Sequence, residues 1–503
     1  MSAGRRWTGA LGAALLGAVV LRPAAVASAQ GSERSAPPPV MASLLGAVDS
    51  AGTGFSFGAF ADLVLGHHPV AVQAQLVADQ ARAELRRAWG AFDPSLTATW
   101  DRKTFNGTSY YNYLDAALKL PLPIGDVTVA FDRTLGKYVN PDRSTSGGGV
   151  VSAGLSIPLG QRLITDERRT ALQQARAARD LGEAEQVGLV NKLLFSAAKA
   201  YGGWYEAWRR RSIAAAGEAL AAFRLDAVRR RVSNGEAAPI DTVEALLEVQ
   251  RRQVSRYEAE GAFYLATLEV TSFLWEDGRA PRPLPDAAVP TLAGLGNGGI
   301  DSTQIASLLD RARQRHPELR KAEAKVRQAS AERLLSAQGV LPFAALKVEG
   351  LSERGREGAG GFLDGDRLAD NFKSAFEVKT PLLFLKETGK LSVATQKLDF
   401  QRIERDRLQR EVEFDVRGAV FDLANLQRLL DRQRSSVRQA GLLRDAEQVR
   451  FENGESTLLI LNLRERLVLD EALKLAAIEA KVASARGALA LATGDRALLA
   501  TER

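Results

Sequence analysis

RVSNGEAAPIDTVEALLEVQRRQ, residues 231–253, holds a long charged helical pattern that stops at Asn234-Gly235-Glu236 and resumes at Pro239. The stretch VRFENGESTLLILNLRERLVLD, residues 449–470, repeats the event at Asn453-Gly454-Glu455. Glycine adopts positive φ at little cost, so it lets a helix end and the chain reverse, and proline is tolerated in the first turn of the next helix. The two matched breaks predict two helical hairpins in a duplicated chain.

The same order of elements occurs twice along the sequence. Pro69 and Pro94 are 25 residues apart and bracket a helical run, and Pro317 and Pro342 repeat that spacing. Each half then passes through strands to a long helical segment, its Asn-Gly turn and a return helix. A helix over residues 160–232 would be about 100 Å long, at about 1.5 Å per residue. The sequence therefore predicts an elongated architecture of two tandem repeats.

Apolar residues recur at steps of three and four along the predicted helices, which is typical of packed long helices. Before the first turn the stripe consists of Val187, Val190, Leu194, Ala197, Tyr201, Trp204 and Trp208. After that turn it consists of Val243, Leu247, Val254, Tyr257, Tyr264 and Leu268. The second half carries Val416, Val420, Leu423 and Leu430, then Leu469, Leu473, Ala476, Ala480, Ala483, Gly487 and Ala490. The small residues late in this stripe predict close approach of a neighbouring helix.

Between the helices the hydrophobic period changes to two, which indicates strands with one apolar and one polar face. The first half has four such segments, at residues 95–103, 112–121, 126–135 and 149–158, where two would suffice for a minimal repeat. The second half alternates within residues 341–381. A soluble half-buried sheet would give the same alternation. Aromatic residues near the strand ends favour a membrane barrel wall: Trp100, Phe105, Tyr110, Tyr111 and Tyr113.

The N-terminus predicts export from the cytoplasm. Arg5-Arg6, an apolar run over residues 8–21 and the small residues Ala27-Ser28-Ala29 form a signal-peptide pattern, and the run is too short for a membrane anchor. No later segment has roughly 18 consecutive apolar residues, so we expect any membrane contact to use strands. The absence of cysteine suits an oxidising compartment and excludes thiolate metal sites.

The charge pattern argues against a nucleic-acid binder. Cleavage near Gln30 removes Arg5, Arg6 and Arg22, which lowers the formal charge from +7 to +4. Arginine and glutamate alternate along the helices in place of a concentrated basic face. An arginine-rich coiled coil that binds an anionic polymer is therefore disfavoured, and no nucleic acid is expected as a partner.

The tandem halves, Pro-bounded strands, long helices and Gly-containing turns resemble the TolC-like outer membrane efflux protein family over residues 55–495. The resemblance implies an α+β membrane protein, a homotrimer whose strands form one shared transmembrane β-barrel and whose long antiparallel helices form a periplasmic α-barrel. It implies an outer-membrane channel of a tripartite efflux or type I secretion system, which receives small molecules or polypeptides from an inner-membrane transporter through a periplasmic adaptor. Outer-membrane lipid would be a further partner. A soluble periplasmic coiled-coil adaptor or scaffold remains the alternative.

The corresponding organisation has six parts. Residues 1–29 are the signal peptide, 30–54 a flexible Pro-rich segment, 276–300 an irregular Pro/Gly-rich linker and 496–503 a tail. The first repeat spans residues 55–275, with strands in 95–158 and long helices in 160–275. The second spans residues 301–495, with strands in 341–381 and long helices in 382–493.

The resemblance also implies that the turns lie at the tunnel entrance, where it closes and adaptors dock. The residues concerned are Asn234, Gly235, Glu236, Asp241, Glu244, Asn453, Gly454, Glu455 and Asn462. Family members often carry carboxylates after the second turn, but this chain has Asn462 and Leu463 there. We therefore expect a charged constriction from Asp241 and Glu244, with Asn462 facing them. An ordinary hairpin turn with Asp241 as helix N-cap is the alternative.

No enzymatic signature stands out. His67, His68 and His316 precede prolines at helix starts, which indicates a structural role. There is no nucleophile elbow, phosphate loop or metal-spaced cluster, and the glycines at 358–361 fit a strand connection. We expect no catalytic residue, cofactor or metal.

Overall fold

The computed structural model describes residues 53–285, 287–292, 304–353 and 371–498. The predicted signal peptide, most of the Pro-rich segment after it, the glycines at 294–299 and 358–361 and the last five residues lie outside the described residues. In the described part of the chain, no helix is long and apolar enough to cross a membrane.

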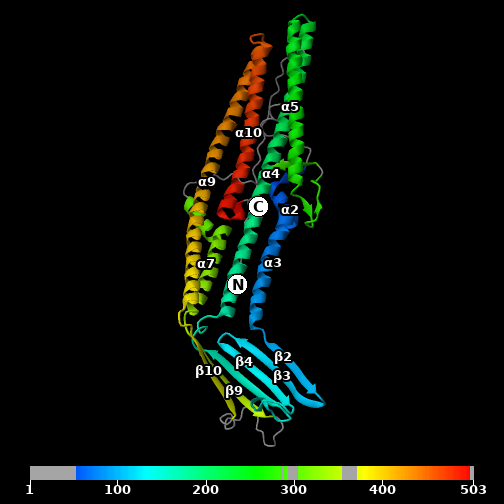
Figure 1. Cartoon of the computed structure of the whole chain (residues 1–503). Coiled ribbons are helices and arrows are strands. Elements are labelled where there is room, and N and C mark those ends of the chain that lie inside the picture. Colours follow the sequence, from blue (N-terminus) through cyan, green and yellow to red (C-terminus); the bar gives the residue numbers. More distant parts are fainter. Residues whose placement is uncertain (1–52, 286, 293–303, 354–370, 499–503) are drawn as a thin grey trace, which may run out of the picture. The chain divides into compact units, whose positions relative to one another are not determined.

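Two long helical hairpins dominate the structure (Figure 1). The first joins α4, Glu167–Ser233, to α5, Pro239–Thr271, and the second joins α9, Leu385–Glu452, to α10, Leu458–Thr493. α4 and α9 have 67 and 68 residues, whereas α5 and α10 have only 33 and 36. Each return helix therefore reaches only part of the way along its partner. The sequence prediction of both hairpins is confirmed.

Shorter helices cover the rest of α4 and α9. α2, Phe57–His67, leads into α3, Pro69–Trp89, which packs on α4, and α6, Ile305–Arg315, leads into α7, Pro317–Gln338, which packs on α9 and α4. Three short 3₁₀ turns complete the helical elements of the described residues: Gly90–Phe92, Pro141–Arg143 and Arg496–Leu498. Five of the described helices thus contact the long helix α4, namely α2, α3, α5, α7 and α10.

Small residues let α10 approach α4 closely, as the stripe predicted. A Cβ added to Gly487 on α10 would lie 3.2 Å from Ala198 Cβ on α4, and one added to Gly202 on α4 would lie 3.1 Å from the Ala480 carbonyl oxygen. Ala476, Ala480, Ala483 and Ala490 are buried. Ridges of small side chains therefore bring the two hairpins into contact.

Six strands of the described residues form one antiparallel sheet, in the order β10-β9-β5-β4-β3-β2. Its members are β2 Ser95–Phe105, β3 Thr108–Leu122, β4 Gly125–Leu135, β5 Val150–Pro158, β9 Phe343–Glu353 and β10 Phe372–Lys379. All four strands predicted for the first half are confirmed. The two halves of the chain meet where β5 pairs with β9, with Leu155 opposite Val348.

An aromatic core ties the start of the first half to the segment between the halves. Tyr201 and Trp204 of α4 are fully buried beside Phe60 of α2. The Tyr201 hydroxyl accepts from the Thr291 amide at 2.9 Å and lies 2.5 Å from the Phe55 carbonyl oxygen. Burial raises the pKa of Tyr201, so the hydroxyl stays protonated.

Part of the predicted irregular linker is regular. β8, Ala288–Thr291, pairs in parallel with β1, Thr53–Ser56, and β6, Trp275–Glu276, pairs with β7, Ala280–Pro281. The prediction of irregular chain was wrong here because a proline in a short edge strand loses one donor but keeps its carbonyl acceptor. The strand β1 also includes residues 53 and 54, which the sequence assigned to the flexible segment.

Candidate functional site at the helix turns and the strand–helix junction

The two Asn-Gly-Glu turns have the same backbone geometry. Gly235 and Gly454 have φ of +78° and +81°, and a Cβ on either would meet nothing within 4 Å. The amide of Glu236 donates to the Arg231 carbonyl at 2.8 Å, and the amide of Glu455 donates to the Arg450 carbonyl at 2.8 Å. These are Schellman-type helix ends, in which the left-handed position requires glycine for conformation alone. Asn234 and Asn453 are the C-caps.

The structure brings the two turns together. The Arg231 guanidinium of α4 stacks over the Phe451 ring of α9, 5.2 Å from its centroid. Leu458, the first residue of α10, is buried in one cluster with Val228 of α4 and Ala245 of α5. The ends of both hairpins therefore form one packed unit.

The first-turn carboxylates lie beside this cluster. Asp241 and Glu244 are half-buried in the first turns of α5, and neither forms an ion pair with a described residue. Asn462 is half-buried in α10. The alternative that Asp241 caps α5 was wrong: the N-cap is Ala238, because the helix starts at Pro239, and no side chain caps it. The carboxylate of Asp241 is therefore not held by the helix end.

A buried polar cluster just behind the turns was missed by sequence reasoning. Arg224 Nη2 of α4 lies 2.6 Å from Glu465 Oε1 of α10, and it donates to Gln448 Oε1 of α9 at 3.0 Å. Glu447 of α9 accepts from the Ser456 hydroxyl at 2.5 Å. The available signal was a charge inside an apolar stripe, since Glu465 follows Leu461 and precedes Val468 at helical spacing. Charges at such positions are rare unless paired.

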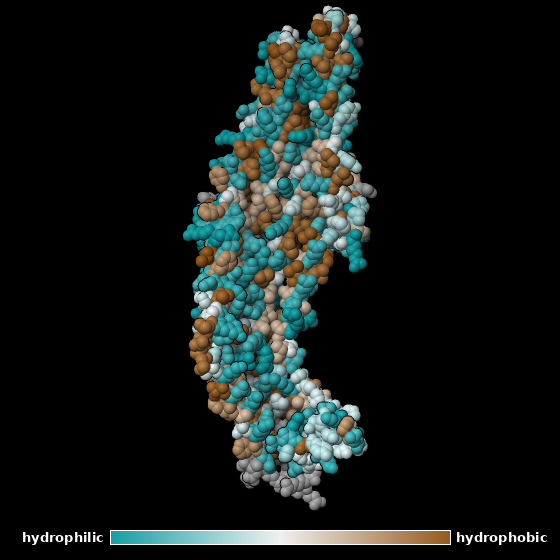
Figure 2. Space-filling view, in the orientation of Figure 1, coloured by the Kyte–Doolittle hydropathy of each residue, from teal (hydrophilic) through white to brown (hydrophobic). Residues whose placement is uncertain are grey.

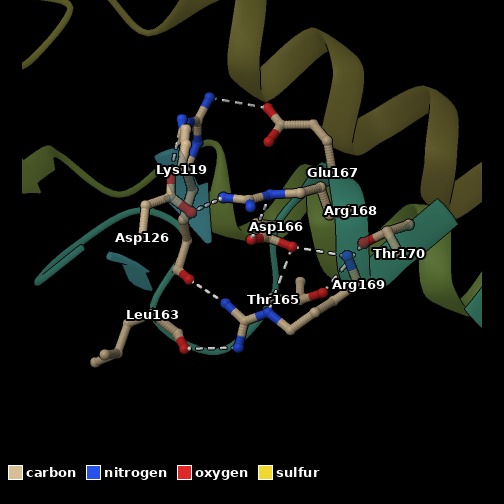
Figure 3. Close-up of polar contacts among 10 residues, drawn as sticks. Lys119, Asp126, Leu163, Thr165, Asp166, Glu167, Arg168, Arg169 and Thr170 are labelled. Atoms are coloured by element: carbon tan, nitrogen blue, oxygen red, sulfur yellow. Dashed lines mark hydrogen bonds and ion pairs between the residues drawn. The ribbon is translucent and has the colours of Figure 1, made fainter. Parts of the chain in front are cut away.

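The other end of α4 is held by polar contacts to the sheet (Figure 3). Asp166 caps α4 by accepting from the Arg169 amide at 2.7 Å. Arg168 Nη2 donates to Asp126 Oδ1 at 2.8 Å, and Lys119 Nζ lies 3.0 Å from Asp126 Oδ2. Asp126 stands just after the tight turn from β3 to β4. The β3–β4 hairpin, which is additional to the two strands of a minimal repeat, is thus fastened to the base of α4.

The predicted interface aromatics gather around the β2–β3 hairpin. Trp100 and Phe105 are 69% and 57% exposed, and Phe105 contacts Tyr110 with ring centroids 6.0 Å apart. Tyr111 and Tyr113 stack at 4.6 Å. Because Trp100 pairs with Leu114 and side chains alternate along β3, Tyr111 and Tyr113 lie on the sheet face opposite Trp100. The sequence pattern alone did not show that Trp100 and the two tyrosines lie on opposite faces, because that depends on how β2 pairs with β3.

The histidines sit where the sequence placed them, at helix boundaries. His68 is the N-cap of α3, and its Nδ1 accepts from the Val70 amide at 3.1 Å. His316 is the N-cap of α7. Burial lowers the pKa of His68 and of His316, which favours the neutral ring. No group of acidic or histidine side chains within the described ranges could hold a metal ion.

Comparison with known proteins agrees with this geometry. The outer membrane efflux protein family matches residues 308–495. No curated protein matches the sequence.

Solved outer-membrane channels share the fold. The Neisseria gonorrhoeae MtrE channel in its open state is 16% identical, with a TM-score of 0.62 over 89% of this chain and 91% of that chain. The Vibrio cholerae outer membrane protein VceC is 14% identical, with a TM-score of 0.58 over 87% and 96%. The Campylobacter jejuni CmeC channel is 12% identical, with a TM-score of 0.56 over 87% and 85%. Residues 308–495 thus resemble outer membrane efflux proteins, and the described chain has the fold of solved outer-membrane channels.

Proposed function

We propose that this chain is an outer-membrane efflux channel and that three copies of it form one conduit. The sheets would build a shared wall in the outer membrane, and the helical hairpins would build a tunnel through the periplasm. A periplasmic adaptor and an inner-membrane transporter would deliver small molecules or polypeptides to its entrance. The alternative of a soluble periplasmic adaptor or scaffold is not favoured.

The observation that carries this proposal is the division of the sheet into two faces. Strand pairing places Leu96, Leu118, Val129, Leu155, Val348 and Phe376 on one face. The other face carries polar and charged side chains, among them Thr97, Asp115, Asp132, Ser152, Glu349 and Lys373. An apolar face against lipid and a polar face against water are what a barrel wall requires.

The surface of α5 supports association of several copies. The side of α5 that faces α4 uses Ala245, Val249 and Ala259, all buried. The predicted heptad stripe points away from the chain's own core, with Tyr257 67% and Tyr264 64% exposed. Figure 2 shows hydrophobic side chains at the surface where the α4–α5 hairpin ends. Such a row of exposed apolar residues suits a second copy of the chain.

For the entrance, we propose that the packed turns form the constriction and that adaptor tips dock on their exposed caps. Asn234, Gly235, Glu236, Asn453, Gly454 and Glu455 are exposed. Asp241 and Glu244 would supply the charge of the constriction, because neither carboxylate is neutralised by an ion pair within the described residues. The two repeats, residues 55–275 and 301–495, remain part of this proposal, with one helical hairpin in each.

Fractionation followed by single-channel recording tests the function. We expect the purified protein to be recovered from outer membranes as a trimer and to give discrete conductance steps in a planar bilayer. Recovery as a soluble periplasmic species without conductance would contradict the channel and favour a scaffold.

A further inference from the structure

The sheet has two free edges, and both are exposed. Every residue of β2 and of β10 is exposed, and each strand has a neighbour on one side only, β3 for β2 and β9 for β10. An unpaired edge leaves backbone N–H and C=O groups without partners, which is costly in lipid. A wall in the membrane therefore needs something to pair with both edges.

The two edges are complementary to each other. With six antiparallel strands in a row, β2 and β10 run in opposite directions, so that β2 of one copy and β10 of the next can pair as an antiparallel ladder. The faces also match. Leu96 and Trp100 of β2 lie on the same face as Phe372 and Phe376 of β10, as traced through the strand pairs. Pairing of the edges would continue the apolar face from copy to copy.

The β3–β4 hairpin has the features of a barrel wall. β3 and β4 pair without interruption from Asn112–Leu135 to Leu122–Gly125 and contribute to both faces. The turn between them is held down by Asp126, through its contacts with Lys119 and Arg168. A Cβ on Gly125 would lie 2.3 Å from the Ser156 carbonyl oxygen, so β4 lies directly against β5 there. These contacts make the hairpin continuous with the rest of the sheet.

We infer that all six strands of each copy enter the membrane wall, closed by β2–β10 pairing between copies. Together with the proposed trimer, on which this inference rests, the wall has 18 strands. With strands about 4.8 Å apart and tilted by about 40°, such a barrel is about 35 Å across between backbones, against about 24 Å for 12 strands. The outlet of the channel would thus be wider than that of a 12-stranded wall.

Disulfide cross-linking of the full-length protein in outer membranes tests the edge pairing, because the chain has no native cysteine. Ala375→Cys on β10 is combined in turn with Ser95→Cys, Thr97→Cys, Thr99→Cys or Asp101→Cys on β2, all on the polar face. Cβ atoms of directly opposite residues lie about 4.5–5.5 Å apart, close enough for oxidation to join them. The matched control combines Ala375→Cys with Ala130→Cys on β4, which faces the same way but lies three strands from β10.

We expect at least one β2–β10 combination to give covalent dimers and trimers on non-reducing gels, and the control to give monomers only. Cross-linking of the control, or a trimer without any β2–β10 bond, would overturn the six-stranded wall and leave the channel itself standing. Loss of the trimer on native gels with the unmodified chain would overturn the proposed assembly, and the inference with it.

Discussion

Arg224 and Glu465 form a buried ion pair between the two helical hairpins, with Nη2 of Arg224 2.6 Å from Oε1 of Glu465 and side chains only 9% and 8% exposed. The two residues are on α4 and α10, just behind the paired turns. Charges removed from water in this way are costly to leave unpaired. The pair therefore makes the stability of this end of the hairpins depend on both partners.

Removal of one partner should be much more harmful than removal of both. We expect Glu465→Leu to destabilise the protein by about 3–5 kcal/mol, because Arg224 keeps its charge in a buried site. The double variant Arg224→Met, Glu465→Leu should recover most of that loss. Denaturant unfolding of the detergent-solubilised protein measures both. A single variant as stable as the double variant would show that the pair does not couple the hairpins.

The turn glycines should be needed for backbone conformation alone. Gly235→Ala and Gly454→Ala should each cost about 1–2 kcal/mol, because φ near +80° strains a residue with a Cβ. Gly418→Ala is the matched control, since Gly418 lies within α9 and a Cβ there meets nothing within 4 Å. That change should stabilise the protein by up to about 1 kcal/mol. Equal effects at all three sites would contradict the assigned turn geometry.

The cap of α3 should make stability depend on pH. Burial lowers the pKa of His68 from 6.5, so the folded protein holds this proton less readily than the unfolded chain. The stability contributed by His68 is present above pH 6.5 and is lost as the pH falls from there towards the lowered folded value.

His68→Asn should flatten this pH dependence and keep the cap, because asparagine accepts from the same amide. His68→Ala should flatten it and also cost about 1 kcal/mol near pH 8, where the neutral ring of the native residue accepts from the Val70 amide. Thermal unfolding between pH 5 and pH 8 compares the three proteins. An unchanged slope in both variants would assign the pH dependence to other groups.

Asp241 and Glu244 should set ion selectivity if they line the constriction. The double variant Asp241→Ala, Glu244→Ala should shift the reversal potential under a salt gradient towards that of a non-selective pore, because a ring of carboxylates favours cations. Glu258→Ala removes an exposed carboxylate elsewhere on α5 and serves as the control. Unchanged cation selectivity in the double variant would rule out these residues as the charged ring.

The exposed stripe on α5 should be a contact between copies. Tyr257→Lys with Tyr264→Lys should lower the fraction of trimer on native gels, because buried lysines without partners oppose association. Arg251→Lys, an exposed substitution on the same helix that keeps its charge, should leave the trimer intact. A trimer of normal stability in the tyrosine variant would place the interface elsewhere.

The sequence by itself determined the local elements. The Asn-Gly breaks, the prolines at helix starts and the period-two segments depend on residues that are neighbours in the chain, so their backbone preferences could be read directly. The bounds of the strands followed within a few residues. The repeated order of elements also sufficed for the resemblance to outer membrane efflux proteins.

Only the tertiary structure decided which surfaces meet. Arg224 and Glu465 are far apart in sequence, so the place of Glu465 within an apolar stripe indicates burial but does not identify its partner. The alternation along β3 and β4 predicted a hairpin but not its place, because pairing partners depend on the whole sheet order. The apolar stripe on α5 has the period of a packed helix, but Ala245 and Val249 are the residues that pack against α4. Their short side chains allow the two helices to approach more closely. The hydrophobic period depends on residues within one helix or strand, whereas the packing partner depends on the shapes and charges of two elements that are distant in sequence.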